Sequence, residues 1–150
     1  MQIIVDILTN TSIQAAGLAW AVAQTMKVVL TLFLSHRFDS SRLFGSGGMP
    51  SSHSAMACAM ITTIGYREGF SSSIFALAFC FAAVVMYDAA GVRRSTGKTA
   101  QTLNQLLDLL SGEGYDTDEE RLKELVGHTP LQVMAGAVLG IIIGILMSRI

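Results

Sequence analysis

Long apolar stretches of this chain carry no charged residue, and they constrain its fold more than any other feature. They include residues 74–86 and 129–147. Only 14% of the 150 residues are charged, whereas soluble domains carry about 25%. In lipid the backbone must satisfy its own hydrogen bonds, which a helix does within one segment. We therefore predict an all-α fold, an integral membrane helical bundle.

Four transmembrane helices can be drawn, at residues 13–34, 52–66, 73–89 and 129–148. The second is short and rich in alanine and methionine, so we place it in the bundle interior rather than against lipid. Glycines spaced four residues apart in the fourth helix predict close helix packing. These glycines are Gly136, Gly140 and Gly144.

The polar insert at residues 95–127 is predicted to contain a short amphipathic helix. Its apolar residues at 100, 103, 106, 107 and 110 recur with helical spacing. The length of the chain suits one domain, which we assign to residues 1–150.

The composition argues against several other kinds of protein. The chain has no interleaved basic and aromatic patch of the kind that binds nucleic acid. Cys58 and Cys80 lie inside apolar stretches, so we expect buried thiols rather than a disulfide. The spacing of cysteines and histidines does not predict a metal site, and we expect no cofactor.

Alternating helices place the ends of the first and third on the same side as the starts of the second and fourth. That side also collects most of the cations, which are Arg37, Arg42, Arg93, Arg94, Lys98, Arg121 and Lys123. The positive-inside rule then places it in the cytoplasm. We expect a protein of the bacterial cytoplasmic membrane, with its site on the cytoplasmic side. A unit of four helices could also form a homodimer to cover its polar groups.

The residues with the clearest chemistry lie on that same side. Residues 47–54 read Gly-Gly-Met-Pro-Ser-Ser-His-Ser and precede a helix, whose N-terminal N–H groups favour an anion. Gly48 has no Cβ, so the loop can approach a ligand closely. Lys27 lies within an apolar span, where a cation is costly. With two imidazoles, His53 and His128, the set suits phosphoryl transfer, one histidine attacking phosphorus and the other donating a proton.

Three segments resemble the type 2 phosphatidic acid phosphatases, which share a core with vanadium-dependent haloperoxidases. Residues 50–53, Pro-Ser-Ser-His, are similar to the family's P-S-G-H. His128, followed by Gln132, Val133, Gly136 and Gly140, is similar to H-x3-D-V-x2-G-x3-G. The Arg93 and Arg94 pair corresponds to the family's Ser-Arg element. The resemblance covers roughly residues 24–144. The segments G-G-M-P-S-S-H-S-A and G-V-R-R look closer still to a divergent bacterial and plant branch of that superfamily.

The resemblance implies a role for each matching residue. His128 would be the nucleophile that forms a phosphohistidine, and His53 the general acid for the leaving group. The phosphate-binding residues would be Lys27, Arg42, Ser51, Ser52, Arg93 and Arg94.

The chain also departs from the family pattern. Gln132 stands where the family has Asp, and Asp88 is a candidate replacement. The separation between the arginine pair and His128 is longer than in the family.

Each feature has a structural alternative. The loop could be a turn before a serine-capped helix, and residues 129–132, Thr-Pro-Leu-Gln, form a capping box. Arginines after a span are often membrane anchors. Lys27 could snorkel toward the interface.

The leading hypothesis is a metal-independent phosphatase acting on a membrane lipid phosphate. Phosphatidylglycerophosphate, phosphatidate and polyprenyl phosphates all remain candidate substrates. The alternative is a non-catalytic membrane protein that binds phospholipid or phosphate for transport or scaffolding. A third hypothesis, vanadate-dependent halide oxidation, is disfavoured because that chemistry suits a soluble pocket.

Overall fold

The computed structural model describes residues 1–35, 48–112 and 128–150, and its regular elements in these ranges are all helical. In chain order they are α1 (Gln2–Thr9), α2 (Thr11–Ser35), α3 (Ser52–Glu68), α4 (Ser73–Tyr87), the π-helical turn η2 (Asp88–Val92), α5 (Arg93–Gly112) and α6 (Pro130–Met147). The prediction of an all-α membrane bundle is confirmed.

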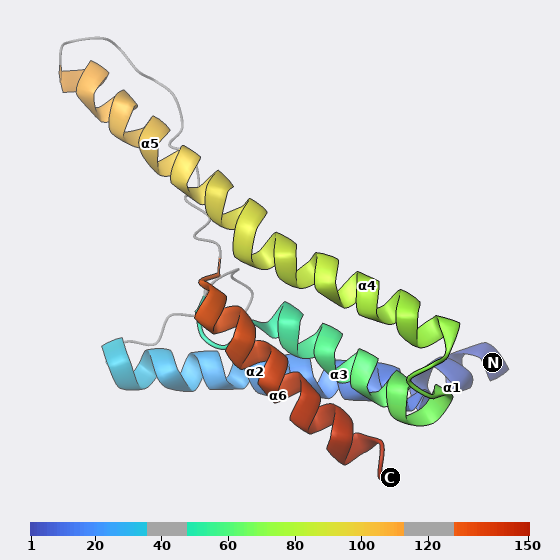
Figure 1. Cartoon of the computed structure of the whole chain (residues 1–150). Helices are drawn as coiled ribbons and strands as arrows, with labels where there is room; N and C mark the ends of the chain where they lie inside the picture. Colours follow the sequence, from blue (N-terminus) through green and yellow to red (C-terminus); the bar gives the residue numbers. More distant parts are fainter. Residues whose placement is uncertain (36–47, 113–127) are drawn as a thin grey trace.

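Three helical stretches are long and apolar enough to cross a membrane, namely Thr11–Phe33, Ser73–Leu109 and Pro130–Met147. The expected second span is α3, which has only 17 residues. It contacts α2, α4 and α6 and lies among them (Figure 1). Many of its buried positions are alanine, serine, threonine or glycine. The prediction that this helix belongs to the bundle interior is therefore confirmed.

The glycine stripe of α6 lies directly on the backbone of α3. A Cβ at Gly136 would clash with the carbonyl oxygen of Ser51, and one at Gly140 with the carbonyl oxygen of Ala55. At Gly144 a Cβ would lie 2.6 Å from Thr62 Cβ. The glycines therefore let the two helices approach until backbone meets backbone, as small-residue stripes do in membranes.

Alanines give α2 and α3 a similar close contact. The buried cluster at this interface contains small residues from both helices together with one isoleucine from α6. Its members are Ala15, Ala19, Ala23, Ala55, Ala59 and Ile143. Because alanine side chains are short, α2 lies close enough for a long side chain to reach the start of α3.

The insert differs from the expectation at its first half. A short helix separated from the third span was predicted, but α4, η2 and α5 form one continuous rod that extends past the bundle (Figure 1). No proline occurs between residues 88 and 112, so nothing in this segment stops the helix. The residues after residue 90 are largely polar. Polarity decides whether a helix prefers water or lipid, but it does not end the helix. The remainder of the insert, residues 113–127, lies outside the described residues.

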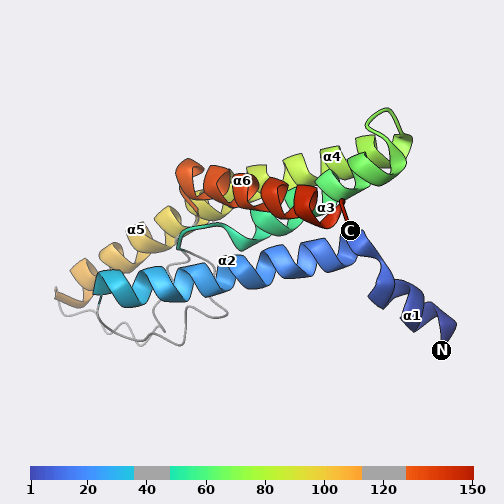
Figure 2. The same ribbon diagram turned by 90° about the horizontal axis from the view of Figure 1, so that it is seen from below.

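The helix α1 was not predicted, since the expected first span begins only at residue 13. Asn10 separates it from α2, since its side-chain oxygen accepts bonds from Ser12 N at 3.0 Å and Ile13 N at 3.2 Å. Figure 2 shows α1 leaving the axis of α2 at an angle. The prediction for the cysteines is correct for Cys58, which is buried, and wrong for Cys80, which is exposed on α4.

We predict that Gly140→Ala destabilises the protein through its contact with α3. Overpacking a close contact costs about 1–3 kcal/mol, and here the opposing atoms are backbone, with Ala59 N 2.9 Å from the added Cβ. Thermal or denaturant unfolding in detergent micelles measures the loss.

Gly17→Ala on α2 is the matched control, because a Cβ there meets nothing within 4 Å. An alanine in a helix interior is favoured over glycine by about 1 kcal/mol, so this variant should be as stable as the parent or more so. Equal effects of the two substitutions would contradict the role given to the glycine stripe.

Candidate functional site

The loop before α3 is held by a glycine and a capping serine. Gly48 has φ +85°, a conformation that favours glycine, and the Met49–Pro50 peptide bond is cis. Ser51 is the N-cap of α3, and its Oγ accepts bonds from Ser54 N at 3.4 Å and Ser54 Oγ at 3.0 Å. Ser51 is fully buried. The interpretation of this loop as a turn before a serine-capped helix is therefore correct for Ser51, whatever further role the loop has.

Lys27 reaches from α2 to the first residue of α3. Its Nζ donates to Gln24 Oε1 at 2.8 Å and to Ser52 Oγ at 3.2 Å. Only 3% of the residue is exposed, and its methylene groups run beside Gly48. Lys27 does not snorkel to a water-exposed position; it is directed at the N-terminus of α3.

The partners of Lys27 are both neutral oxygens. Within residues 1–35, 48–112 and 128–150, no carboxylate forms an ion pair with its ammonium group. A buried charge without a countercharge is costly. The arrangement would therefore be stabilised by an anion beside Lys27 and the N–H groups that begin α3.

His128 lies immediately before α6 and is buried, with 3% of its surface exposed. Its backbone N–H donates to the carbonyl of Ala89 at 3.2 Å. Its Nδ1 is 3.3 Å from Gln132 Oε1. The imidazole is thus oriented from two directions, by the η2 turn through its backbone and by α6 through its ring.

The hydrogen bonds of Gln132 determine which nitrogen of His128 carries the proton. Thr129 N donates to Gln132 Oε1 at 3.0 Å, so that atom is an acceptor. Nδ1, which faces the same oxygen, must then be the donor. In the neutral ring Nε2 is left as the nitrogen with the lone pair. Nε2 is therefore the atom of His128 suited to nucleophilic attack.

The predicted capping box of α6 is confirmed. Thr129 Oγ1 accepts from Gln132 N at 3.4 Å, and the Gln132 side chain accepts from Thr129 N. Gln132 thus both caps the helix and orients His128. The backbone carbonyl oxygen of Gln132 accepts a hydrogen bond from Ser51 N at 3.0 Å. This bond joins the loop motif to the histidine motif, which lie far apart in sequence.

A π-helical turn supplies the carbonyl that holds His128. The η2 turn spans Asp88–Val92, and π-helical turns inside α-helices are frequent at functional sites because they disturb the regular hydrogen-bond ladder. Here Ala89 O is directed at His128 N. Asp88 begins the turn and is partly exposed.

The remaining predicted site residues differ in how far the structure describes them. His53 is partly exposed on the first turn of α3, one residue after Ser52. Arg93 and Arg94 begin α5, next to the η2 turn, but their side chains lie outside the described residues. Arg42 falls in residues 36–47 and lies wholly outside them. Their roles stay predictions.

Sequence reasoning missed two contributors to the site. Gln24 holds Lys27, and its sequence signal was a second polar residue one helical turn earlier on the same face of an apolar span. The carbonyl of Ala89 holds His128, and no side-chain pattern could have indicated it.

Fold and site together describe a membrane helical bundle in which a serine-histidine loop meets a buried histidine and a buried lysine. A family model described as "Divergent PAP2 family" matches residues 8–143. The uncharacterized membrane protein YuiD of Bacillus subtilis (strain 168) is 35% identical over 153 residues, which cover 95% of this chain and 97% of that protein. The chain belongs to the Divergent PAP2 family, and the resemblance seen in the sequence is confirmed. No solved structure matches the chain.

We predict that Lys27→Met weakens the binding of tungstate, a phosphate-like anion, by about 10–100-fold, since hydrogen bonds to charged groups contribute about 1.5–3 kcal/mol. Isothermal titration calorimetry in detergent measures this. Because the substitution removes a buried charge whose partners among the described residues are neutral, the unfolding temperature should stay the same or rise.

Lys98→Met is the control, because Lys98 is an exposed lysine on α5. It should leave tungstate binding unchanged. Unchanged tungstate binding in Lys27→Met would show that Lys27 does not contribute to the anion site.

Proposed function

We propose that this protein is an integral membrane phosphatase that removes phosphate from a lipid phosphate. Substrates of the phosphatidylglycerophosphate, phosphatidate and polyprenyl phosphate classes all fit the proposal. The observation that carries it is the buried Lys27, whose hydrogen bonds within the described residues go to two neutral oxygens, Gln24 Oε1 on α2 and Ser52 Oγ at the N-terminus of α3. That position suits a phosphate group, and the bond between Ser51 N and Gln132 O brings the His128 motif to the same place.

In the first step Nε2 of His128 attacks phosphorus, and the bond from phosphorus to the ester oxygen breaks. The departing lipid oxygen takes a proton from the imidazolium of His53. In the second step water gives a proton to His53 and attacks phosphorus. The bond from phosphorus to nitrogen then breaks, which releases phosphate and restores His128.

Cations stabilise the negative charge that spreads over the phosphoryl oxygens in both steps. The ammonium group of Lys27 and the N–H of Ser52, both at the start of α3, would do this. Arg42, Arg93 and Arg94 would add charge on the same side. Because these groups neutralise the oxygens, the proposal needs no metal ion, and EDTA should not inhibit the reaction.

We place the site at the cytoplasmic face of the membrane. The ends of α2 and α4 and the starts of α3 and α6 lie at one end of the bundle. In the sequence, most of the cations stand between α2 and α3 or between α4 and α6. A lipid headgroup can reach this end while its tails remain in the bilayer.

We predict that His128→Ala abolishes phosphate release from phosphatidate in detergent micelles, because the covalent intermediate cannot form. His53→Ala should slow the same reaction by about 10²–10⁴-fold, the usual contribution of a general acid. Circular dichroism and gel filtration check that both variants are folded. Full activity in both variants would overturn the mechanism.

The two histidines can be told apart by the leaving group. The leaving group of p-nitrophenyl phosphate needs no proton. With this substrate, His53→Ala should release the leaving group in the first step at most of the parent rate. His128→Ala should remain inactive with either substrate. A similar response of both variants to both substrates would contradict the division of roles.

We further predict that Gln132→Glu raises the rate of phosphate release several-fold. A carboxylate would still cap α6, since glutamate also completes a capping box. It would also hold the Nδ1 proton and stabilise the imidazole as positive charge develops on it. Gln132→Met, which removes both bonds, should lower the rate. An unchanged rate in Gln132→Met would argue against Gln132 as the residue that orients His128.

A non-catalytic role is the second candidate, and the neutral amide of Gln132 favours it. An amide cannot balance the charge of an imidazolium as a carboxylate does. The same pocket would then bind a phospholipid or phosphate for transport or scaffolding. Tight binding of phosphate or vanadate without any turnover would support this role over the phosphatase.

A further inference from the structure

An apolar groove of about 470 Å³ lies between α3, α4 and α6. Its walls include Cys58 and Thr62 of α3, Phe79 and Met86 of α4, and Met134 and Ile141 of α6. The hydroxyl of Thr62 donates to the carbonyl of Cys58 at 2.7 Å, so it is already bonded to its own helix. The groove therefore offers an incoming molecule mostly carbon and sulfur, which suits hydrocarbon rather than a polar ligand.

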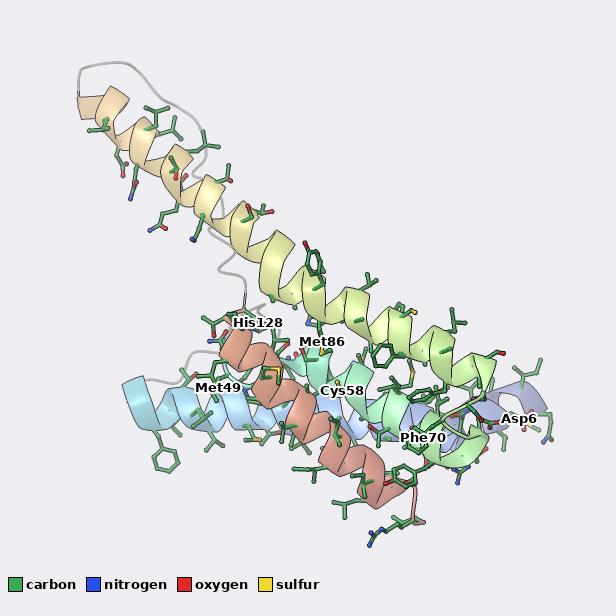
Figure 3. The ribbon with its side chains drawn as sticks, viewed as in Figure 1. Asp6, Met49, Cys58, Phe70, Met86 and His128 are labelled. Carbon is green, nitrogen blue, oxygen red and sulfur yellow. The ribbon has the colours of Figure 1, made fainter. Side chains whose placement is uncertain are left out.

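One end of the groove adjoins the candidate site. Met134 follows Gln132 by two residues, and Cys58 lies one helical turn beyond Ser54. Met86 comes shortly before the η2 turn that holds His128. Figure 3 shows His128, Met86, Cys58 and Phe70 in that order along the bundle. A molecule in the groove would therefore have one end beside the histidine.

The length of the groove matches one leaflet of a bilayer. Along α6 its walls run from Met134 to Ile145, a rise of about 16 Å at 1.5 Å per residue. The hydrocarbon core of a membrane is about 30 Å thick, so this is about half of it. The far end is lined by aromatic rings, with the Tyr66 and Phe70 centroids 5.4 Å apart and those of Phe70 and Phe75 5.2 Å apart.

The shape and chemistry of the groove suit a hydrocarbon chain. Its walls are almost entirely apolar, and a single chain is much thinner than a helix, which is about 10 Å in diameter.

We propose that the groove holds one hydrocarbon chain of a lipid whose phosphate lies between Lys27 and His128. The proposal rests on the proposed function for the position of the phosphate, and it adds where the chain lies. Three helices then line the chain along one side and direct the headgroup toward the buried histidine. The chain passes from the bilayer or a micelle into the groove, so the groove contributes packing contacts and a fixed position rather than burial from water.

Neighbouring isoleucines on α6 provide the test. Ile141 lines the groove and is 42% exposed, whereas Ile142 is 51% exposed and does not line it. Ile141→Trp would fill part of the groove, and it should raise the KM for dioleoyl phosphatidate by about tenfold because several methylenes lose their packing contacts with the groove walls. The KM for dibutyryl phosphatidate, whose chains are short, should not change. Ile142→Trp should leave both values as in the parent.

A readout without turnover separates this proposal from the phosphatase. A phosphatidate with a diazirine in the middle of one chain should crosslink, on illumination, to groove residues of α3, α4 and α6. Such crosslinks, with no phosphate release by the parent protein from a lipid phosphate of any of the three candidate classes, would refute the phosphatase and support the groove. Phosphate release, with crosslinks on the outer face of α2 and equal KM values for both tryptophan variants, would refute the groove alone.

Discussion

The close contact between the backbones of α3 and α6 is the interaction on which the rest of the structure depends. Gly136 and Gly140 bring α6 against the carbonyls of Ser51 and Ala55. In lipid, helices gain little from burying apolar surface against each other, so close packing and hydrogen bonds must hold them together. The same contact brings Gln132 O within 3.0 Å of Ser51 N. Packing and site geometry therefore have one origin.

The buried lysine depends on that arrangement. The alanines of α2 bring the helix near α3, and Lys27 then spans the remaining distance to Ser52. A cation in such a place destabilises the protein unless its charge is balanced. Stability given up at a single buried position is typical of sites built for a ligand, which supplies the missing interaction when it binds. This is the physical reason to expect an anion there.

The rod of α4, η2 and α5 contributes in a different way. It stays helical beyond the bundle, but its hydrogen-bond register changes at the η2 turn. That change directs the carbonyl of Ala89 at His128. Along α4, before this turn, the apolar groove lies between α4 and α6. One helix thus helps to orient the candidate nucleophile and forms a wall of the groove beside it.

The sequence by itself determined the helical membrane class, the cap at Thr129, the glycine stripe and the family motifs, because these depend on local pattern and spacing. It did not determine that the insert continues α4, since local polarity changes the environment of a helix without ending it. Nor could it give the partners of Lys27 or the bond from His128 to Ala89. Those contacts join residues distant in sequence. They exist only because glycine and alanine interfaces fix how closely, and at what height, the helices meet.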